Sequence, residues 1–173
     1  MPRIPRAIID EMVAHARADL PNEACGIVHA REGVPVASYR VKNAAASPYR
    51  YLMDPMQQYR LETQRDESGE TLFAIYHSHV ASEGRPSQTD RRQAFFPPAQ
   101  DDNDFDRDPA YPGTGYILVS LAEEPPTVRA FQVSRGGIVD EEPIETATLL
   151  SVLAAAASLV YRWVRARWPW LFW

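Results

Sequence analysis

One apolar run, residues 71–76, most constrains what this chain can fold into. Its sequence, TLFAIY, is rich in β-branched and aromatic residues and leads directly into His77-Ser78-His79. This pattern predicts a buried strand that carries two histidines at its C-terminal end. Because residues i and i+2 of a strand point to the same face, His77 and His79 can reach one metal ion while Ser78 points to the opposite face.

Ser87 and Asp90 follow this strand and add a third metal-capable side chain. The sequence SQTD after Pro86 is also an ordinary helix start, with Ser87 as the N-cap and an acidic residue at position N3. Both interpretations can hold, because the first turn of a helix is a rigid place from which Asp90 can bind a metal. Two histidines and one aspartate leave the fourth tetrahedral position open, which is typical of a catalytic zinc site.

Glu23 is the candidate for the group that moves protons during hydrolysis. It lies where a strand is predicted to begin, in the sequence PNEACGIV. A carboxylate at the mouth of a buried strand is either a solvated charge at an edge or a group directed into a cleft. Glu23 alone therefore leaves both interpretations open.

The remaining cysteine and histidines are predicted to have no catalytic role. Cys25 is the sole cysteine, and its apolar neighbours indicate a buried, unreactive thiol. His15 is predicted to lie on the polar side of the first helix and His29 at the surface end of a strand.

Together, Glu23 and the pattern His-Ser-His-x7-Ser-x2-Asp resemble the JAMM (MPN+) metalloprotease family. The similarity extends over about residues 4–143, and the chain is most similar to the small bacterial hydrolases that act on ubiquitin-like sulfur-carrier proteins. Val80 departs from the pattern, since many members have proline after the second histidine. Further segments that carry the resemblance are MVAHAR (12–17), NEACG (22–26), Asn43 with Ser47-Pro48, IYHSH (75–79) and GYILVS (115–120).

The resemblance implies a cytidine-deaminase-like fold and one catalytic zinc ion. By that resemblance His77, His79 and Asp90 would be the zinc ligands, Glu23 the general acid/base, and Ser87 a hydrogen-bond donor. The bond cut would join the C-terminal diglycine of a ubiquitin-like sulfur-carrier protein to the amino group of cysteine, so that cysteine is released. The alternatives are a broader deubiquitinase-like isopeptidase and, in another class, a non-catalytic MPN scaffold that only binds partners.

Hydrophobic periodicity and turn signals predict an α+β fold. Three strands near the C-terminal end, joined by turn-like EEPP and RGG sequences, are expected to form an antiparallel meander. The whole would be a mixed, largely antiparallel sheet flanked by helices. The predicted helices are 5–19, 55–66 and 87–95, and the predicted strands are 24–30, 34–42, 50–53, 71–77, 115–121, 127–134 and 137–142.

We predict a catalytic domain over residues 1–143 and a helical tail over residues 144–173. Residues 146–161 carry no charge, and all four tryptophans lie in the arginine-rich stretch after them. This uncharged run is shorter than the ~20 residues that a membrane-spanning helix needs. Its pattern predicts an amphipathic helix that covers the enzyme's own sheet, pairs with a second subunit as a homodimer, or lies on a membrane surface through residues 146–173.

Composition and charge fit a cytoplasmic enzyme. A chain of 173 residues with 45% hydrophobic content can bury one sizeable core. A single cysteine excludes an internal disulfide framework, and the N-terminal residues lack the apolar segment of a signal peptide. The net charge of −5 gives no support to nucleic-acid binding, which requires a basic face.

An acidic loop at residues 101–108 follows the predicted ligand helix. Its alternating aspartates lack the glycine and the closing glutamate of an EF-hand calcium loop. The remaining interpretations are a solvated loop and a border of the substrate cleft.

Overall fold

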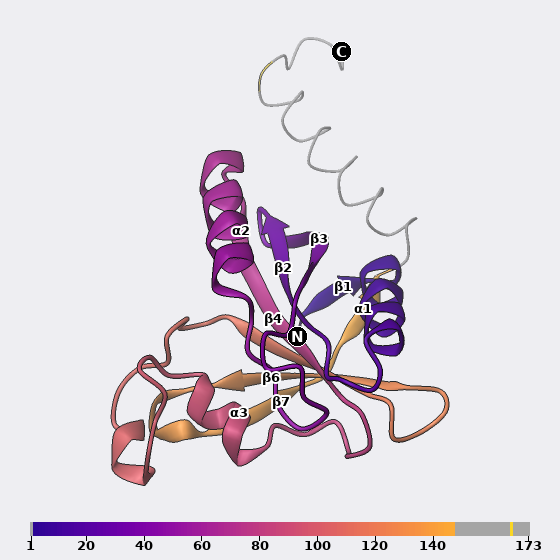
Figure 1. Cartoon of the computed structure of the whole chain (residues 1–173). Helices are drawn as coiled ribbons and strands as arrows, with labels where there is room; N and C mark the ends of the chain where they lie inside the picture. The colour runs from indigo at the N-terminus through magenta and orange to yellow at the C-terminus, as the bar shows by residue number, and fades with distance from the viewer. Residues whose placement is uncertain (1, 148–166, 168–173) are drawn as a thin grey trace.

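A six-stranded sheet forms the centre of the computed structural model, which describes residues 2–147 and residue 167 (Figure 1). The order of the strands is β3-β2-β4-β5-β6-β7. β4 and β5 are parallel, and the other neighbouring pairs in this sheet are antiparallel. The strands are β2 (Cys25–Arg31), β3 (Val34–Val41), β4 (Thr71–His79), β5 (Gly115–Ser120), β6 (Thr127–Val133) and β7 (Val139–Glu142). The predicted α+β class and the mixed, largely antiparallel sheet are confirmed.

Helices lie on both sides of this sheet. α1 (Arg6–Ala18) buries Ile8, Met12 and Ala16, which belong to a core on one face together with side chains of β2, β4 and β5. α2 (Pro55–Ser68) begins after Asp54, whose carboxylate accepts a hydrogen bond from the Gln57 N–H at 2.9 Å. α3 (Gln88–Gln93) and two short 3₁₀ helices, η1 (Asp102–Phe105) and η2 (Arg135–Gly137), are the other helices within residues 2–147.

Alternation along β4 divides its side chains between two cores. Ala74 and Tyr76 pack in the core beneath α1, whereas Ile75 packs in the core on the other face. Because His77 and His79 follow Ile75 at intervals of two residues, they belong to the second face. The sheet therefore presents both histidines on the side away from α1.

Several predicted boundaries were wrong. β4 continues to His79, two residues beyond the predicted end at 77, so His79 also lies within the strand. The strand predicted at 50–53 is absent from the described structure; only Met53 forms an isolated bridge, to Asn43. The helix predicted over 87–95 ends at Gln93.

A second sheet of two parallel strands was not predicted. It joins β1 (Arg3–Pro5) to β8 (Glu145–Ala147), and Arg3 Nε donates to Glu145 Oε2 at 2.7 Å. Three residues are too few to show the alternation of apolar and polar side chains by which a half-buried strand is recognised, because that pattern needs about four to eight residues. The division into a domain at 1–143 and a tail remains a prediction.

The predicted C-terminal helix lies outside the described residues, apart from Arg167. Within the described part of the chain, no helix is long and apolar enough to cross a membrane.

Candidate metal centre

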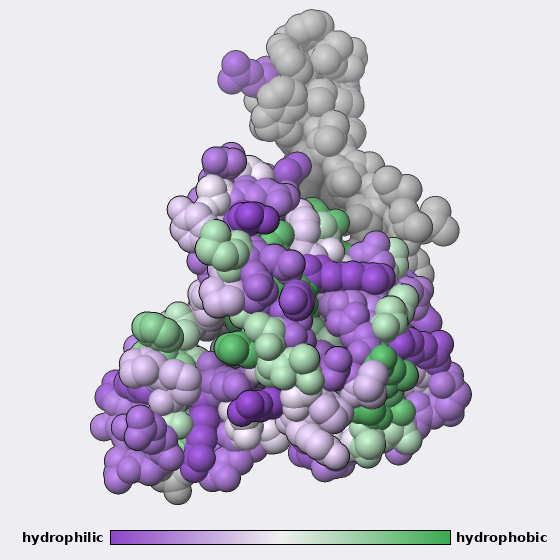
Figure 2. Space-filling view, in the orientation of Figure 1, coloured by the Kyte–Doolittle hydropathy of each residue, from purple (hydrophilic) through white to green (hydrophobic). Residues whose placement is uncertain are grey.

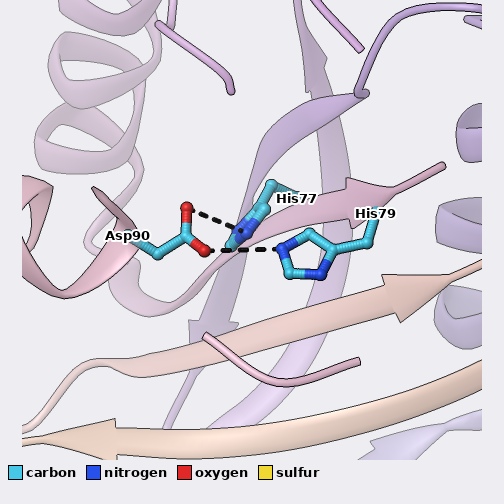
Figure 3. Close-up of side chains that lie close together, drawn as sticks. All are labelled: His77, His79 and Asp90. Carbon is cyan, nitrogen blue, oxygen red and sulfur yellow. Dashed lines mark hydrogen bonds and ion pairs between the residues drawn. The ribbon is translucent and has the colours of Figure 1, made fainter. Parts of the chain in front are cut away.

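Three buried side chains converge at the C-terminal end of β4 (Figure 3). His77 and His79 come from the strand and Asp90 from the first turn of α3. His77 Nε2 lies 3.4 Å from Asp90 Oδ1, and His79 Nε2 lies 3.4 Å from Asp90 Oδ2. All three ligating atoms lie within 4.8 Å of one another. The structure thus brings together the three residues predicted as ligands.

This spacing fits a tetrahedral zinc site. Bond lengths of about 2.0–2.1 Å place neighbouring ligand atoms of a tetrahedron about 3.4 Å apart. The His77 Nε2 atom is buried and lacks a hydrogen-bond partner among the described residues. Buried polar atoms are normally satisfied, so an unpartnered nitrogen beside two further donor atoms fits a metal ion.

The two histidines are oriented in different ways. His79 Nδ1 lies 2.8 Å from the carbonyl oxygen of Glu83, which fixes the ring and leaves Nε2 free to bind a metal. The ring of His77 stacks on Tyr51, with 4.5 Å between the ring centroids and 25° between the ring planes. Packing therefore sets the orientation of His77, and a hydrogen bond sets that of His79.

Asp90 is held by the helix start predicted from sequence. Ser87 is the N-cap of α3, and its side chain forms a capping box with Asp90. The Ser87 N–H and the Ser87 hydroxyl each donate to Asp90 Oδ2 at 2.7 Å. Burial opposes ionisation of Asp90, but the nearby imidazoles of His77 and His79 and the hydrogen bond from the Ser87 hydroxyl outweigh it and hold the pKa of this carboxyl well below its usual range.

Glu23 precedes β2 at the position that faces the two histidines. Cys25 pairs with His77 in the β2–β4 register, and the Ser78 N–H donates to the Ala24 carbonyl oxygen at 2.9 Å. Continuing this antiparallel register places Glu23 opposite His79. The Glu23 carboxylate is buried, and Oε2 has no hydrogen-bond partner in the described structure.

Burial raises the pKa of Glu23 to about 7; His79 opposes the shift and Asp90 adds to it. A buried carboxyl with a neutral pKa beside a metal-binding group is a candidate proton carrier. Of the two interpretations left open by the sequence, a group directed into the site fits this position better than a solvated charge.

The structure confirms one expectation for the remaining thiol and histidines and corrects two. Cys25 is buried as predicted, and burial raises the pKa of its thiol to about 12. His15 does not lie on a polar side: it is buried, with Nδ1 2.9 Å from the Tyr76 hydroxyl. His29 is also buried, with Nδ1 3.3 Å from Glu70 Oε2. Partners distant in sequence allow both imidazoles to be buried.

A groove of about 790 Å³ adjoins the metal centre. Its lining includes Tyr51, whose ring stacks on His77, together with Ile75, Phe95, Phe96 and Tyr111. Phe96 is 82% exposed. The face of the molecule seen in Figure 2 is mainly hydrophilic, with small and separate hydrophobic patches. The groove thus combines apolar walls with access to solvent beside a reactive centre.

Three aspartates of the acidic loop bind groups of the protein itself. Asp101 Oδ1 accepts from the Asn103 N–H at 2.8 Å, and Asp104 Oδ2 accepts from the Gln100 N–H at 2.7 Å. Asp106 pairs with Arg135 at 3.0 Å. Among the described residues, the His77, His79 and Asp90 group is the one cluster whose spacing suits a metal ion.

Residues 5–134 match the model of a protein family described as prokaryotic homologs of the JAB domain. The chain is 33% identical over 140 residues to the CysO-cysteine peptidase of Mycobacterium tuberculosis, which corresponds to 79% of this chain and 85% of that protein. It is also 33% identical over 95 residues to the desampylase of Haloferax volcanii, covering 51% of this chain and 68% of that protein.

Solved structures agree with this relationship. A protein from Desulfitobacterium hafniense superposes with a TM-score of 0.70 at 32% identity, covering 86% of this chain and 94% of that chain. A JAB1/MPN domain protein from Archaeoglobus fulgidus, at 17% identity, shares the fold with a TM-score of 0.50 over 84% of this chain and 98% of its own. The chain is therefore a hydrolase that belongs to the prokaryotic homologs of the JAB domain.

Proposed function

We propose that this protein is a zinc-dependent peptidase that cuts after the C-terminal diglycine of a ubiquitin-like sulfur-carrier protein and releases cysteine. One observation carries the proposal: the buried Glu23 carboxylate and the His77, His79 and Asp90 group lie at the same end of β2 and β4. A metal-binding group alone could be structural. A neighbouring buried proton carrier makes it suitable for hydrolysis.

His77, His79 and Asp90 would hold the zinc ion and leave its fourth position open. A zinc ion lowers the pKa of a bound water from about 15.7 toward ~7, so that a nucleophile exists at neutral pH. Glu23 would accept a proton from the attacking water and return it to the departing amine. Such a shuttle typically contributes ~10² to 10⁴ in rate.

Ser87 is proposed to stabilise the charge that develops on the scissile carbonyl oxygen. Its hydroxyl donates to Asp90 Oδ2 in the present structure, so this role requires the hydroxyl to turn toward the substrate. Loss of one such donor costs about 10² to 10³ in turnover in other hydrolases.

The substrate class is inferred from the relatives. The peptidase of Mycobacterium tuberculosis is named for a CysO-cysteine bond, and a relative from Thermus thermophilus, 32% identical over 92 residues, is named as a probable TtuB-protein conjugate cleaving protease. The groove beside Tyr51 supports a substrate with an extended segment leading to the metal centre. A broader isopeptidase is the second candidate, favoured by the desampylase relative. We expect the reaction to take place in the cytoplasm.

Mass spectrometry of a diglycine-ended sulfur-carrier protein that bears a C-terminal cysteine tests the proposal. The wild type should remove one cysteine, whereas Glu23→Gln and the chelator-treated enzyme should not. Glu67→Gln is the matched control, because Glu67 is exposed on α2, away from the site. An intact carrier after incubation with zinc-loaded wild type would reject this substrate, and isopeptide-linked conjugates would then be assayed.

A further inference from the structure

We propose that Asn43 is a positioning residue, which fixes Glu23 against the metal-binding group. The inference rests on the proposed function, because it assigns Asn43 a part in the same reaction. Asn43 lies outside the His-Ser-His-x7-Ser-x2-Asp pattern, and its side chain is 6% exposed.

All four hydrogen-bonding positions of the Asn43 amide are used. Nδ2 donates to the carbonyl oxygens of Glu23 at 2.9 Å and Arg50 at 3.1 Å. Oδ1 accepts from the N–H groups of Ala45 and Leu52, each at 3.0 Å. The two N–H donors of this amide face carbonyl oxygens, and its oxygen faces two N–H groups. Exchanging the amide oxygen and nitrogen would set acceptor against acceptor and donor against donor, so the orientation of the amide is fixed.

The two ends of this amide perform different tasks. Oδ1 closes the loop of residues 43–53 on itself, which a purely structural asparagine would also do. Nδ2 donates to Arg50 within the loop and also reaches out of the loop to Glu23, a residue 20 positions earlier in the chain. The Glu23 N–H donates to the carbonyl oxygen of Ser47 at 2.9 Å, so both main-chain polar groups of Glu23 are bonded to this loop.

The residue after Glu23 is fixed from the other side. The Ala24 N–H donates to the Ser78 hydroxyl at 2.8 Å, and the Ser78 N–H donates back to the Ala24 carbonyl oxygen at 2.9 Å. Glu23 thus extends from a backbone held by the 43–53 loop and by β4. This matters because misplacing a catalytic group by about 1 Å can cost about 10² in rate.

The same loop also contacts a predicted metal ligand. Tyr51 stacks on His77, and the Ala44 N–H donates to the carbonyl oxygen of Leu52 at 2.7 Å, next to Tyr51. Asn43 therefore ties the proton carrier to the segment that packs on the metal-binding group. Its position sets the distance between the two.

Asn43→Asp keeps the two Oδ1 bonds within the loop and removes both Nδ2 bonds, to Glu23 and to Arg50 of the loop. The carboxylate keeps the oxygen that accepts from Ala45 and Leu52, but it turns a charged oxygen toward the carbonyls of Glu23 and Arg50. At about pH 8, where aspartate is ionised, the contact with Glu23 becomes repulsive. We expect kcat on the carrier-cysteine substrate to fall about 10- to 100-fold, while KM stays within about twofold.

Two readouts separate positioning from loss of structure. Bound zinc, measured by elemental analysis, and the slow reaction of the buried Cys25 thiol with a thiol reagent should both match the wild type. Asn103→Asp is the matched control, since Asn103 is exposed. Its side-chain amide makes no hydrogen bond within the described part of the chain.

Equal kcat for Asn43→Asp and Asn103→Asp would overturn the inference. If Asn43→Asp instead loses zinc or exposes Cys25, its effect is on the structure and the inference is overturned. A lowered kcat with full zinc content and a protected Cys25 supports positioning of Glu23. A wild type that cleaves no diglycine-ended substrate rejects the proposed function, and the role of Asn43 with it.

Discussion

At the scale of single residues, burial suits Glu23 to its proposed role as the proton carrier. Its side chain is 4% exposed, and this burial raises its pKa to about 7. A proton carrier is most effective when its pKa lies near the working pH, because it must both accept and donate. An exposed glutamate at the same sequence position would remain ionised and return the proton poorly.

The rate should therefore fall at low pH. Glu23 must be ionised to accept a proton, so kcat/KM rises with pH through the pKa of this carboxyl and then levels off. A divalent cation nearby favours the ionised form, so the midpoint in the zinc-loaded enzyme lies below the value of about 7 found without metal. Measuring kcat/KM from about pH 5 to 9 tests this. An identical acid limb in Glu23→Gln would assign the titration to another group.

The sequence predicted that His77, His79 and Asp90 lie together because the geometry of this group is local. The alternation of a strand places His77 and His79 on one face, and a helix N-cap at Ser87 directs Asp90. Tyr51 was missed because its role arises only when the 43–53 loop folds onto His77. Asn43 is one of the residues that carry the family resemblance, but its hydrogen bonds cannot be predicted from the sequence.

At the scale of elements, α3 shows how a short helix can serve a site. It has six residues, too few to be stable by itself. Its capping box satisfies the first N–H groups and at the same time fixes the carboxylate of Asp90. One set of hydrogen bonds thus defines both the helix start and the position of Asp90.

Removing this cap should affect both stability and zinc affinity. Ser87→Ala and Asp54→Ala each delete an N-cap, of α3 and α2 respectively, and each should cost about 1 kcal/mol in the free energy of unfolding. Only Ser87→Ala should also weaken zinc binding, since it removes the hydroxyl bond to Asp90 Oδ2 and leaves the main-chain N–H of residue 87 as the one bond from that residue to this carboxylate. Denaturation midpoints and competition with a chromogenic chelator provide the measurements. Equal zinc affinity in the two variants would contradict a role for Ser87 in orienting Asp90.

The centre of the sheet depends on close contacts of β2 with β3 and β4 at Gly26. Gly26 has no side chain, and a Cβ atom there would clash with the carbonyl oxygen of Tyr39 and the ring of Tyr76. Gly26→Ala should therefore lower the free energy of unfolding by about 1–3 kcal/mol or more. Gly115→Ala is the control, because its Cβ would meet the carbonyl oxygen of Phe73 at an ordinary 3.5 Å. Thermal unfolding compares the two, and similar losses would contradict the specific clash at Gly26.

At the scale of the whole molecule, the two ends of the described fold are joined. β1 pairs with β8, and Ile4 and Ile144 pack in the core beneath α1. The sequence did not predict this closure, because both strands are short and far apart in the chain. The main sheet was predicted well, since its long strands carry apolar runs separated by turn residues.

Two truncations test where the folded unit ends. A chain ending at residue 147 retains β8, so its melting temperature and kcat should equal those of the full chain. A chain ending at residue 143 loses β8, the Arg3–Glu145 pair and the packing of Ile144, which should cost about 1–3 kcal/mol. Differential scanning calorimetry and the carrier-cysteine assay measure both effects. Loss of activity in the chain ending at 147 would show that residues 148–173 contribute to catalysis. If the full chain binds lipid vesicles and the fully active chain ending at residue 147 does not, residues 148–173 are instead assigned to contact with a membrane surface.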